Sequence, residues 1–183
     1  MILTRTPFRI PLGGGGTDLP SFYKQHGGFL FSAAIDKYMY ISINRPILDS
    51  LIRIKYSRIE IVENTAQIEH DLARAALEYY GIKNGIEIAS TADVPAGTGM
   101  GSSGSYLVGL LKGLQTITRR GSGVQELAEL ACHIEIDLLQ KPVGKQDQYL
   151  AAYGGFTVMN IDRNGVVQVS DAAFEVKQFA VDA

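Results

Sequence analysis

Asp93-Val-Pro-Ala-Gly-Thr-Gly-Met-Gly-Ser-Ser-Gly-Ser105 is the stretch around which the rest of the chain is organised. A strand-like apolar run, 85–91, leads into it, and a run with helical spacing, 106–114, leads out of it. Its alternating glycines let the backbone approach a ligand closely, and free N–H groups at the start of a helix bind anions. The composition of the stretch supports a phosphate-binding loop and a plain strand-to-helix connection equally well.

The spacing of the glycines excludes the two most common phosphate-binding motifs. A Walker loop ends in Gly-Lys-Ser or Gly-Lys-Thr, whereas this loop ends in Gly-Ser-Ser-Gly. A dinucleotide fingerprint needs Gly-x-Gly-x-x-Gly, which the spacing of Gly97, Gly99 and Gly101 does not match. In a phosphate-binding loop of another kind, Ser102 and Ser103 would present hydroxyls to phosphate oxygens or to a phosphate-bound Mg²⁺.

The composition is that of an ordinary globular protein, and 183 residues suit one domain, alone or with part of a second. The net charge of -2 gives no electrostatic reason to expect nucleic acid or an anionic membrane as a partner. A single cysteine, Cys132, excludes an internal disulfide, and no apolar run approaches the ~18 residues of a membrane span. We therefore expect a cytoplasmic protein.

Hydrophobic periodicity predicts a chain whose first third is mostly strand and whose later part is mostly helix. Strands are expected at 1–10, 29–35, 37–45, 51–56, 59–63, 85–91, 156–161, 166–169 and 174–181. Helices are expected at 21–26, from 68 to 80, at 106–114, from 122 to 138 and after 144–149. This order favours an α+β fold over an alternating parallel α/β fold.

Three local details carry further expectations. Pro7 near the middle of the first strand favours an edge position, and the loop 11–20 is expected to face a ligand. Ser122 and Gln125 form a capping box for the third long helix. That helix is expected to bury one apolar face, made of Val124, Leu127, Ala131, Ile134 and Leu138.

Three separated stretches resemble the GHMP kinases, the family of galactokinase, homoserine kinase, mevalonate kinase and phosphomevalonate kinase. Pro7-Phe-Arg-Ile-Pro-Leu-Gly-Gly-Gly-Gly-Thr-Asp18 is similar to their first motif, a strand that leads to a sugar-binding loop. Pro95-Ala-Gly-Thr-Gly-Met-Gly-Ser-Ser103 matches their Pro-x-x-x-Gly-x-Gly-Ser-Ser phosphate loop without a gap. The third stretch, Gly144-Lys-Gln-Asp-Gln-Tyr149, together with the four glycines, resembles the branch of D-glycero-D-manno-heptose 7-phosphate kinases.

The resemblance implies an α+β domain like domain 2 of ribosomal protein S5 and ATP and Mg²⁺ as cofactors. The implied reaction transfers the γ-phosphate of ATP to the anomeric hydroxyl of D-glycero-D-manno-heptose 7-phosphate. Its product would be the 1,7-bisphosphate, which is used to build nucleotide-activated heptose. Kinases of fucose, galactose or an octose, and a non-catalytic nucleotide- or sugar-binding module, are the alternatives. The joint presence of Asp147, Arg9 and Glu135 argues against a sensor, because binding alone needs no base, whereas the absence of a third glycine-rich motif argues for one.

The resemblance also assigns roles to single residues. Asp147 matches the carboxylate that takes the acceptor's hydroxyl proton, and Arg9 matches a cation beside it. Ser103 and Glu135 match the two Mg²⁺ ligands, although Glu135 taken alone would more simply be a solvated helix carboxylate. Asp147 taken alone would equally well be a turn-forming residue before a helix.

The remaining implied site residues fall into two groups. The phosphate loop would bind ATP through Pro95, Gly97, Gly99, Met100, Gly101, Ser102, Ser103 and Gly104. The sugar phosphate would bind through Gly14, Gly15, Gly16, Thr17, Asp18 and Lys145, with Arg5 as a weaker candidate. Adenine is expected near the strand 38–45 and the loop after it, and Asp18 could instead cap the turn that follows it. His133 is expected to be a packed or flanking residue and no catalyst.

Two departures from the family pattern have consequences. Position 104 is glycine where many relatives have alanine or serine, which is expected to loosen the start of the helix. No third glycine-rich motif follows Gly155, so residues 1–183 are expected to form only the N-terminal, ATP-binding domain of such a kinase. An apolar face meant for a second domain would then be exposed and would favour self-association.

Overall fold

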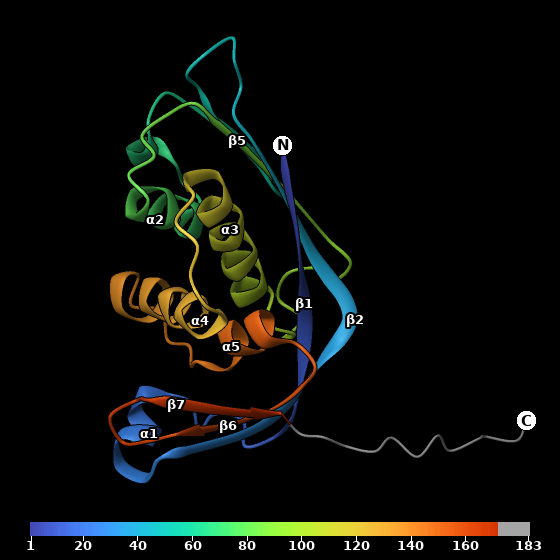
Figure 1. Cartoon of the computed structure of the whole chain (residues 1–183), viewed down its shortest axis with the longest axis vertical. Coiled ribbons are helices and arrows are strands. Elements are labelled where there is room, and N and C mark those ends of the chain that lie inside the picture. Colours follow the sequence, from blue (N-terminus) through green and yellow to red (C-terminus); the bar gives the residue numbers. More distant parts are fainter. Residues whose placement is uncertain (172–183) are drawn as a thin grey trace, which may run out of the picture.

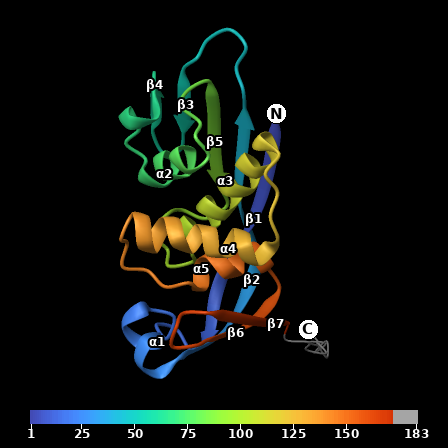
Figure 2. The ribbon, with the colours of Figure 1, turned by 60° about the vertical axis from the view of Figure 1, so that its left-hand side comes forward.

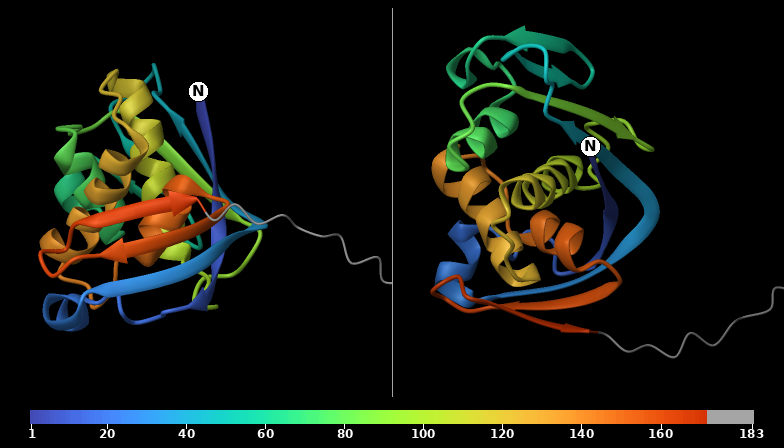
Figure 3. Two further views of the ribbon diagram at one scale, coloured as in Figure 1. Left: turned by 60° about the horizontal axis from the view of Figure 1, so that its bottom comes forward. Right: turned by 45° about the horizontal axis from the view of Figure 1, so that its top comes forward.

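A computed structural model describes residues 1–171 of the chain, in which seven strands form one sheet. The sheet has the strand order β4-β3-β5-β2-β6-β7, and β1 pairs with β2 beside this path. Helices α2 to α5 lie on one side of the sheet, and the sheet curves around them (Figures 1 and 3). The α+β prediction is confirmed, while the strand expected at 174–181 lies outside the described residues.

The elements follow one another in the order β1, α1, β2, β3, β4, a 3₁₀ turn, α2, β5, α3, α4, a π-helical segment, α5, β6 and β7. The strands are β1 (Ile2–Gly13), β2 (Gly28–Asn44), β3 (Ile52–Lys55), β4 (Ile59–Val62), β5 (Ile86–Ala92), β6 (Phe156–Ile161) and β7 (Val167–Asp171). The helices are α1 (Pro20–His26), the 3₁₀ turn (Thr65–Gln67), α2 (Asp71–Tyr79), α3 (Ser102–Thr118), α4 (Val124–Cys132), the π-helical segment (His133–Leu138) and α5 (Gln146–Tyr153). Within residues 1–171, none of these helices has the length and apolar character to cross a membrane.

The strand β2 corrects the prediction of two paired strands at 29–35 and 37–45, because it runs unbroken for 17 residues. The prediction interrupted the strand at Asp36, but β1 pairs with β2 on both sides of this residue, and the backbone stays extended through it. On its other edge, β2 pairs first with β6, from Gly28 to Ala33, and then with β5, from Met39 to Asn44. One long strand therefore holds the two halves of the sheet together.

The strand β1 confirms the edge position that Pro7 indicated, since β2 is its one partner among the described residues. The register shifts between Pro7, which pairs with Tyr38, and Arg9, which pairs with Ala34, so the extra residues of this bulge lie on β2, just before Arg9 in the ladder. The strand also continues to Gly13, three residues further than expected. The bulge and the extension place the end of β1 beside the glycine-rich loop.

The helix α3 is the centre of the core, with Leu107, Leu110 and Leu111 fully buried. Two glycines allow its close approach to the sheet. A Cβ at Gly109 would lie 2.6 Å from the Thr6 hydroxyl oxygen of β1, and one at Gly113 would meet the end of Ile43 on β2. The tight packing fixes the start of α3, and with it the phosphate loop, relative to β1.

The helix α4 begins one residue later than predicted, with Gly123 as N-cap, so the predicted capping box of Ser122 and Gln125 is wrong; Glu126 Oε2 instead accepts from the Gly123 N–H (3.1 Å). The expected buried face is only partly correct, because Val124 and Leu138 are exposed. The helix widens into the π-helical segment at 133–138, which changes the phase of its side chains. As a result Glu135 turns inward and Leu138 turns outward.

Candidate active site

The predicted phosphate loop connects β5 to α3 and ends at Gly101, a left-handed residue (φ 78°) that serves as the N-cap of α3. The first backbone hydrogen bond of the helix runs from Ser105 N–H to Gly101 O (2.9 Å). The N–H groups of Ser102 and Ser103 precede this bond and have no partner within the helix. They present the anion-binding end of a 17-residue helix to the loop.

Arg9 joins this loop to α5 through four contacts. Its backbone N–H donates to Met100 O (3.2 Å), and its Nη1 donates to Gly99 O (2.6 Å). Its Nε donates to Asp147 Oδ1 (2.7 Å), and its Nη2 forms an ion pair with the same oxygen. The structure thus brings together two predicted catalytic residues that lie 138 positions apart in the sequence.

Asp147 is a largely buried carboxylate with 23% of its side chain exposed. Burial raises its pKa, the Arg9 guanidinium opposes that rise, and the negative charge of Asp18 adds to it. The carboxylate therefore depends on Arg9 to stay ionised in this environment. An ionised carboxylate next to a phosphate loop is able to accept a proton from a bound hydroxyl.

Glycine is required where α3 meets Asp147. A Cβ at Gly104 would lie 2.7 Å from Asp147 Cβ, 2.8 Å from Asp147 C and 3.0 Å from Gln148 N. A Cβ at Gly101 would lie 3.2 Å from Asp147 Cγ. The glycine at position 104, which was expected to loosen the helix start, instead lets α3 and α5 approach closely.

The two predicted metal ligands lie on different helices, Ser103 in the first turn of α3 and Glu135 in the π-helical segment. Glu135 is completely buried, its Oε2 accepts from Gln148 Nε2 (2.7 Å), and its Oε1 has no hydrogen-bond partner among the described residues. Burial raises the pKa of Glu135, while the Ser103 hydroxyl, the Gln148 amide and the Lys141 charge oppose the rise. An unsatisfied buried oxygen beside a serine hydroxyl fits a site that a cation completes.

The number of protein ligands available to such a cation is small. Within residues 1–171, no three side chains of the His, Cys, Asp and Glu types converge on one point. Mg²⁺ commonly binds through one or two carboxylates, water and substrate phosphates. The donor set therefore suits Mg²⁺ better than a cation that needs a full protein cage.

The four-glycine loop is closed by hydrogen bonds from two polar side chains. Thr17 Oγ1 donates to Gly14 O (2.8 Å) and accepts from Phe29 N–H (3.1 Å). Asp18 is buried, and its Oδ2 accepts from Gln146 N–H (2.9 Å) at the first residue of α5. Asp18 therefore does not cap the turn that follows it, where Leu19 is the N-cap of α1. Instead it binds the helix that carries Asp147.

Three consecutive residues of α5 now connect to three different parts of the chain. Gln146 contacts Asp18 in the glycine-rich loop, Asp147 contacts Arg9 of β1, and Gln148 contacts Glu135 of the π-helical segment. Gln148 was not predicted as a site residue, because a glutamine in a helix has no distinguishing local signal. Its role in the site follows only from its hydrogen bond to Glu135 in the π-helical segment.

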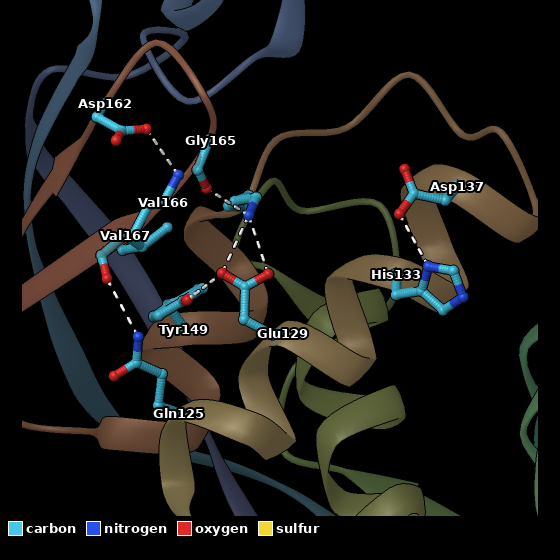
Figure 4. A network of polar contacts seen from close by, with 10 residues as sticks. Gln125, Glu129, His133, Asp137, Tyr149, Asp162, Gly165, Val166 and Val167 are labelled. Carbon is cyan, nitrogen blue, oxygen red and sulfur yellow. Dashed lines mark hydrogen bonds and ion pairs between the residues drawn. The ribbon is translucent and has the colours of Figure 1, made fainter.

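Lys145 occupies a different environment from the one expected of a substrate ligand. Its ammonium donates to Glu129 Oε1 and Oε2 (3.0 and 2.9 Å) and to Gly165 O (2.8 Å). The Tyr149 hydroxyl donates to the same carboxylate, and Figure 4 shows Glu129, Tyr149 and Gly165 gathered around this point. Substrate binding by Lys145 stays a prediction, while its visible contacts join α4 and α5 to the β6–β7 turn.

Two other residues, the weaker substrate candidate Arg5 and the non-catalytic His133, lie away from this centre. The Arg5 guanidinium lies over the Tyr38 ring, 4.5 Å from its centroid. His133 is half-exposed, with Nδ1 2.9 Å from Asp137 Oδ2 (Figure 4). No contact joins either residue to Asp147 or Glu135 among the described residues.

A cavity of about 620 Å³ adjoins the phosphate loop and shares Pro95, Ser102 and Ser103 with it. An aromatic group lines the cavity further on: His70 meets Tyr56 edge to face and stacks on Tyr106, with ring centroids 4.7 Å apart in both pairs. Burial raises the pKa of Tyr106, whose hydroxyl has no partner among the described residues. The strand 38–45, where adenine was expected, contributes only Met39 to the lining.

Comparison with known proteins places the chain among sugar and mevalonate kinases. Residues 71–155 match the family model described as GHMP kinases N terminal domain. The chain is 30% identical over 180 residues to D-glycero-alpha-D-manno-heptose 7-phosphate kinase of Campylobacter jejuni, covering 92% of this chain and 53% of the relative. A galactokinase of Roseiflexus is 28% identical over 165 residues, covering 84% of this chain and 40% of the relative.

Solved structures agree with these relatives. A D-glycero-D-manno-heptose 1-phosphate kinase from Bacteroides thetaiotaomicron superposes with a TM-score of 0.85 at 30% identity, covering 93% of this chain and 59% of that one. A putative sugar kinase from Campylobacter jejuni superposes with a TM-score of 0.77 at 27% identity, covering 93% and 55% of the two chains. The chain spans about half the length of the curated relatives it matches.

Proposed function

Because this chain belongs to the GHMP kinases, we propose that residues 1–183 form the N-terminal, ATP-binding domain of a sugar kinase. The proposed reaction transfers the γ-phosphate of ATP to the anomeric hydroxyl of D-glycero-D-manno-heptose 7-phosphate. The observation that carries the proposal is the contact of Arg9 with both the phosphate loop, at Gly99, and Asp147. It connects the region proposed for phosphate with the base proposed for the acceptor.

In the proposed mechanism, Asp147 accepts the proton of the acceptor hydroxyl as the phosphoryl group transfers. Arg9 keeps Asp147 ionised, and its guanidinium lies where it can stabilise negative charge near the loop. Phosphoryl transfer depends mainly on positioning and charge stabilisation, so a single well-placed carboxylate suffices. The contacts of α5 with three other elements hold that carboxylate in place.

Mg²⁺ would be held by Ser103 and Glu135, whose Oε1 is otherwise unpaired. A bound Mg²⁺ neutralises phosphate charge during transfer. The chain's own part is to keep Glu135 ionised at a buried position, assisted by Gln148 and the Lys141 charge. The free N–H groups at the start of α3 would bind the phosphate oxygens directly.

The 620 Å³ cavity is the proposed site of the nucleoside, because it opens from the phosphate loop and has aromatic walls. The aromatic wall that His70 and Tyr106 form would bind a purine ring. Asp18 and the glycine-rich loop, on the other side of Asp147, would bind the sugar. Heptose is favoured over galactose because the solved heptose kinase superposes with a TM-score of 0.85 at 30% identity, against 0.71 and 19% for a galactokinase.

The test is ADP release from Mg²⁺-ATP by this chain with D-glycero-D-manno-heptose 7-phosphate, beside galactose, fucose and no sugar. We expect heptose-dependent release that Asp147→Asn abolishes and that the matched surface variant Asp137→Asn retains. Release with galactose or fucose in place of heptose would contradict the acceptor. Nucleotide binding without release on any sugar would contradict catalysis by these residues alone, and absence of nucleotide binding would contradict the whole proposal.

A further inference from the structure

A separate crevice of about 420 Å³ lies where the end of α3 meets α2 and α4. Gln115 in this crevice is 13 residues beyond Ser102 in the same helix, which corresponds to about 20 Å along its axis. The three helices lie next to one another in Figure 2. The crevice shares no lining residue with the nucleoside cavity or with the phosphate loop.

The floor of the crevice carries an unsatisfied amide. Gln115 is only 3% exposed, its Nε2 donates to Ser122 Oγ (2.7 Å), and its Oε1 has no partner among the described residues. Turning the amide by half a revolution would let the oxygen accept from Ser122, and it would leave the nitrogen unpaired instead. In both orientations one polar atom at the floor lacks a partner, which is uncommon for a buried amide.

The rim of the crevice carries one charge of each sign. Arg120 and Glu126 both line it, and within residues 1–171 neither of them forms an ion pair. Glu126 Oε2 accepts from the Gly123 N–H, so its second oxygen is available. Tyr80 also lines the crevice, and burial raises its pKa while the Gln115 amide and the Arg120 charge oppose the rise. Tyr79 and Leu130 add an apolar wall.

We propose that this crevice binds a small zwitterion of the amino-acid class with an apolar side chain. Its carboxylate would pair with Arg120, its ammonium would lie between Glu126 and Gln115 Oε1, and its side chain would pack on Tyr79 and Leu130. A simple anion would meet Glu126, a simple cation would meet Arg120, and a neutral molecule would leave both charges unused. The volume lies within the range of small-molecule sites.

The probe is L-leucine, added to ¹⁵N-labelled protein while amide NMR signals are followed. We expect saturable shifts at Gln115, Arg120 and Glu126, and no such shifts with leucinol, which lacks the carboxylate, or with 4-methylpentanoate, which lacks the ammonium. Arg120→Gln is expected to weaken binding by at least about tenfold through loss of a charged hydrogen bond. Arg119→Gln is the matched control, because Arg119 is exposed, adjacent and outside the crevice, and it should bind as the parent does.

Three results would overturn the proposal: no shift at these positions up to about 10 mM leucine, equal binding of leucinol or 4-methylpentanoate, or unchanged affinity in Arg120→Gln. The spectrum of each variant reports whether it is folded. All of these readouts are independent of kinase activity, so their failure and failure of the proposed kinase function are distinguishable.

Discussion

Gly104→Ala tests whether α3 and α5 approach one another as closely as the structure indicates. The new Cβ would lie 2.7 Å from Asp147 Cβ and 2.8 Å from the Asp147 carbonyl carbon. Real Cβ atoms do not come so close to a backbone, and that part of α5 is held by the contacts of Asp147 with Arg9 and of Gln148 with Glu135. The helix cannot move away without breaking at least one of them.

Two opposing contributions determine the size of the effect on stability. Overpacking of this kind costs about 1–3 kcal/mol. Alanine in place of glycine inside a helix gains about 0.8–1.0 kcal/mol. We therefore expect a net loss of about 0–2 kcal/mol in the free energy of unfolding, measured by urea denaturation. Gly121→Ala is the control, because a Cβ at Gly121 would meet no atom within 4 Å.

The effect on activity should exceed the effect on stability. A displacement of about 1 Å at Asp147 is enough to reduce phosphoryl transfer about a hundredfold. The resemblance to relatives with alanine or serine at this position predicts tolerance, so the two expectations differ in sign. An alanine variant that is about 1 kcal/mol more stable than the parent and equally active would show that α3 and α5 lie further apart than described.

Three further predictions concern the site and the outer face of the sheet. Glu135→Gln should raise the free energy of unfolding relative to the parent, and increasingly so as pH rises above the unfolded pKa, because burial raises the folded pKa of Glu135 and its ionisation then opposes folding. Urea denaturation at about pH 3.5, below the unfolded pKa of roughly 4.3, and at about pH 7 measures this difference. A Mg²⁺ titration of nucleotide binding should show weaker binding by the variant. Arg9→Met should lower turnover about a hundredfold. It should also move the acid limb of the pH–activity profile to higher pH, because the guanidinium opposes the rise that burial causes in the pKa of Asp147. An acid limb at the same pH in the variant would show that this limb does not report Asp147. Phe29→Ser should reduce any self-association seen by sedimentation, because Phe29 is 53% exposed on the outer face of β2, and an unchanged sedimentation profile in an associating sample would place the interface elsewhere.

Local sequence patterns predicted most elements of the fold but not their continuity. The strand was predicted to break at Asp36 because periodicity carries no information about β1, which pairs with β2 on both sides of that residue. The burial of Glu135 could not be predicted from periodicity either. The expected apolar face assumes an α-helical period throughout, whereas the helix becomes π-helical at His133. In both cases a neighbouring element or a different hydrogen-bond pattern determined the outcome.

The site shows the same division between local and distant information. The phosphate loop was visible in sequence because its glycines and serines are consecutive. The pairing of Arg9 with Asp147 was expected only from the family resemblance, because no local rule connects residues 138 positions apart. The aromatic cavity was missed, since His70, Tyr56 and Tyr106 come from separate elements and each looks like an ordinary core or surface residue alone.

The short helix α5 explains why these separate features act as one site. Its first turn contributes polar contacts in place of an apolar stripe: Gln146 with Asp18, Asp147 with Arg9, and Gln148 with Glu135. Each contact satisfies a buried or half-buried charge whose solvation was lost on folding, so removing one partner leaves an uncompensated charge. The proposed sugar loop, base and metal ligand are therefore coupled through three adjacent residues. A substitution at any one of the three partners should displace the first turn of α5 and so weaken the contacts of the other two, and double-mutant cycles between Asp18, Arg9 and Glu135 should consequently be non-additive.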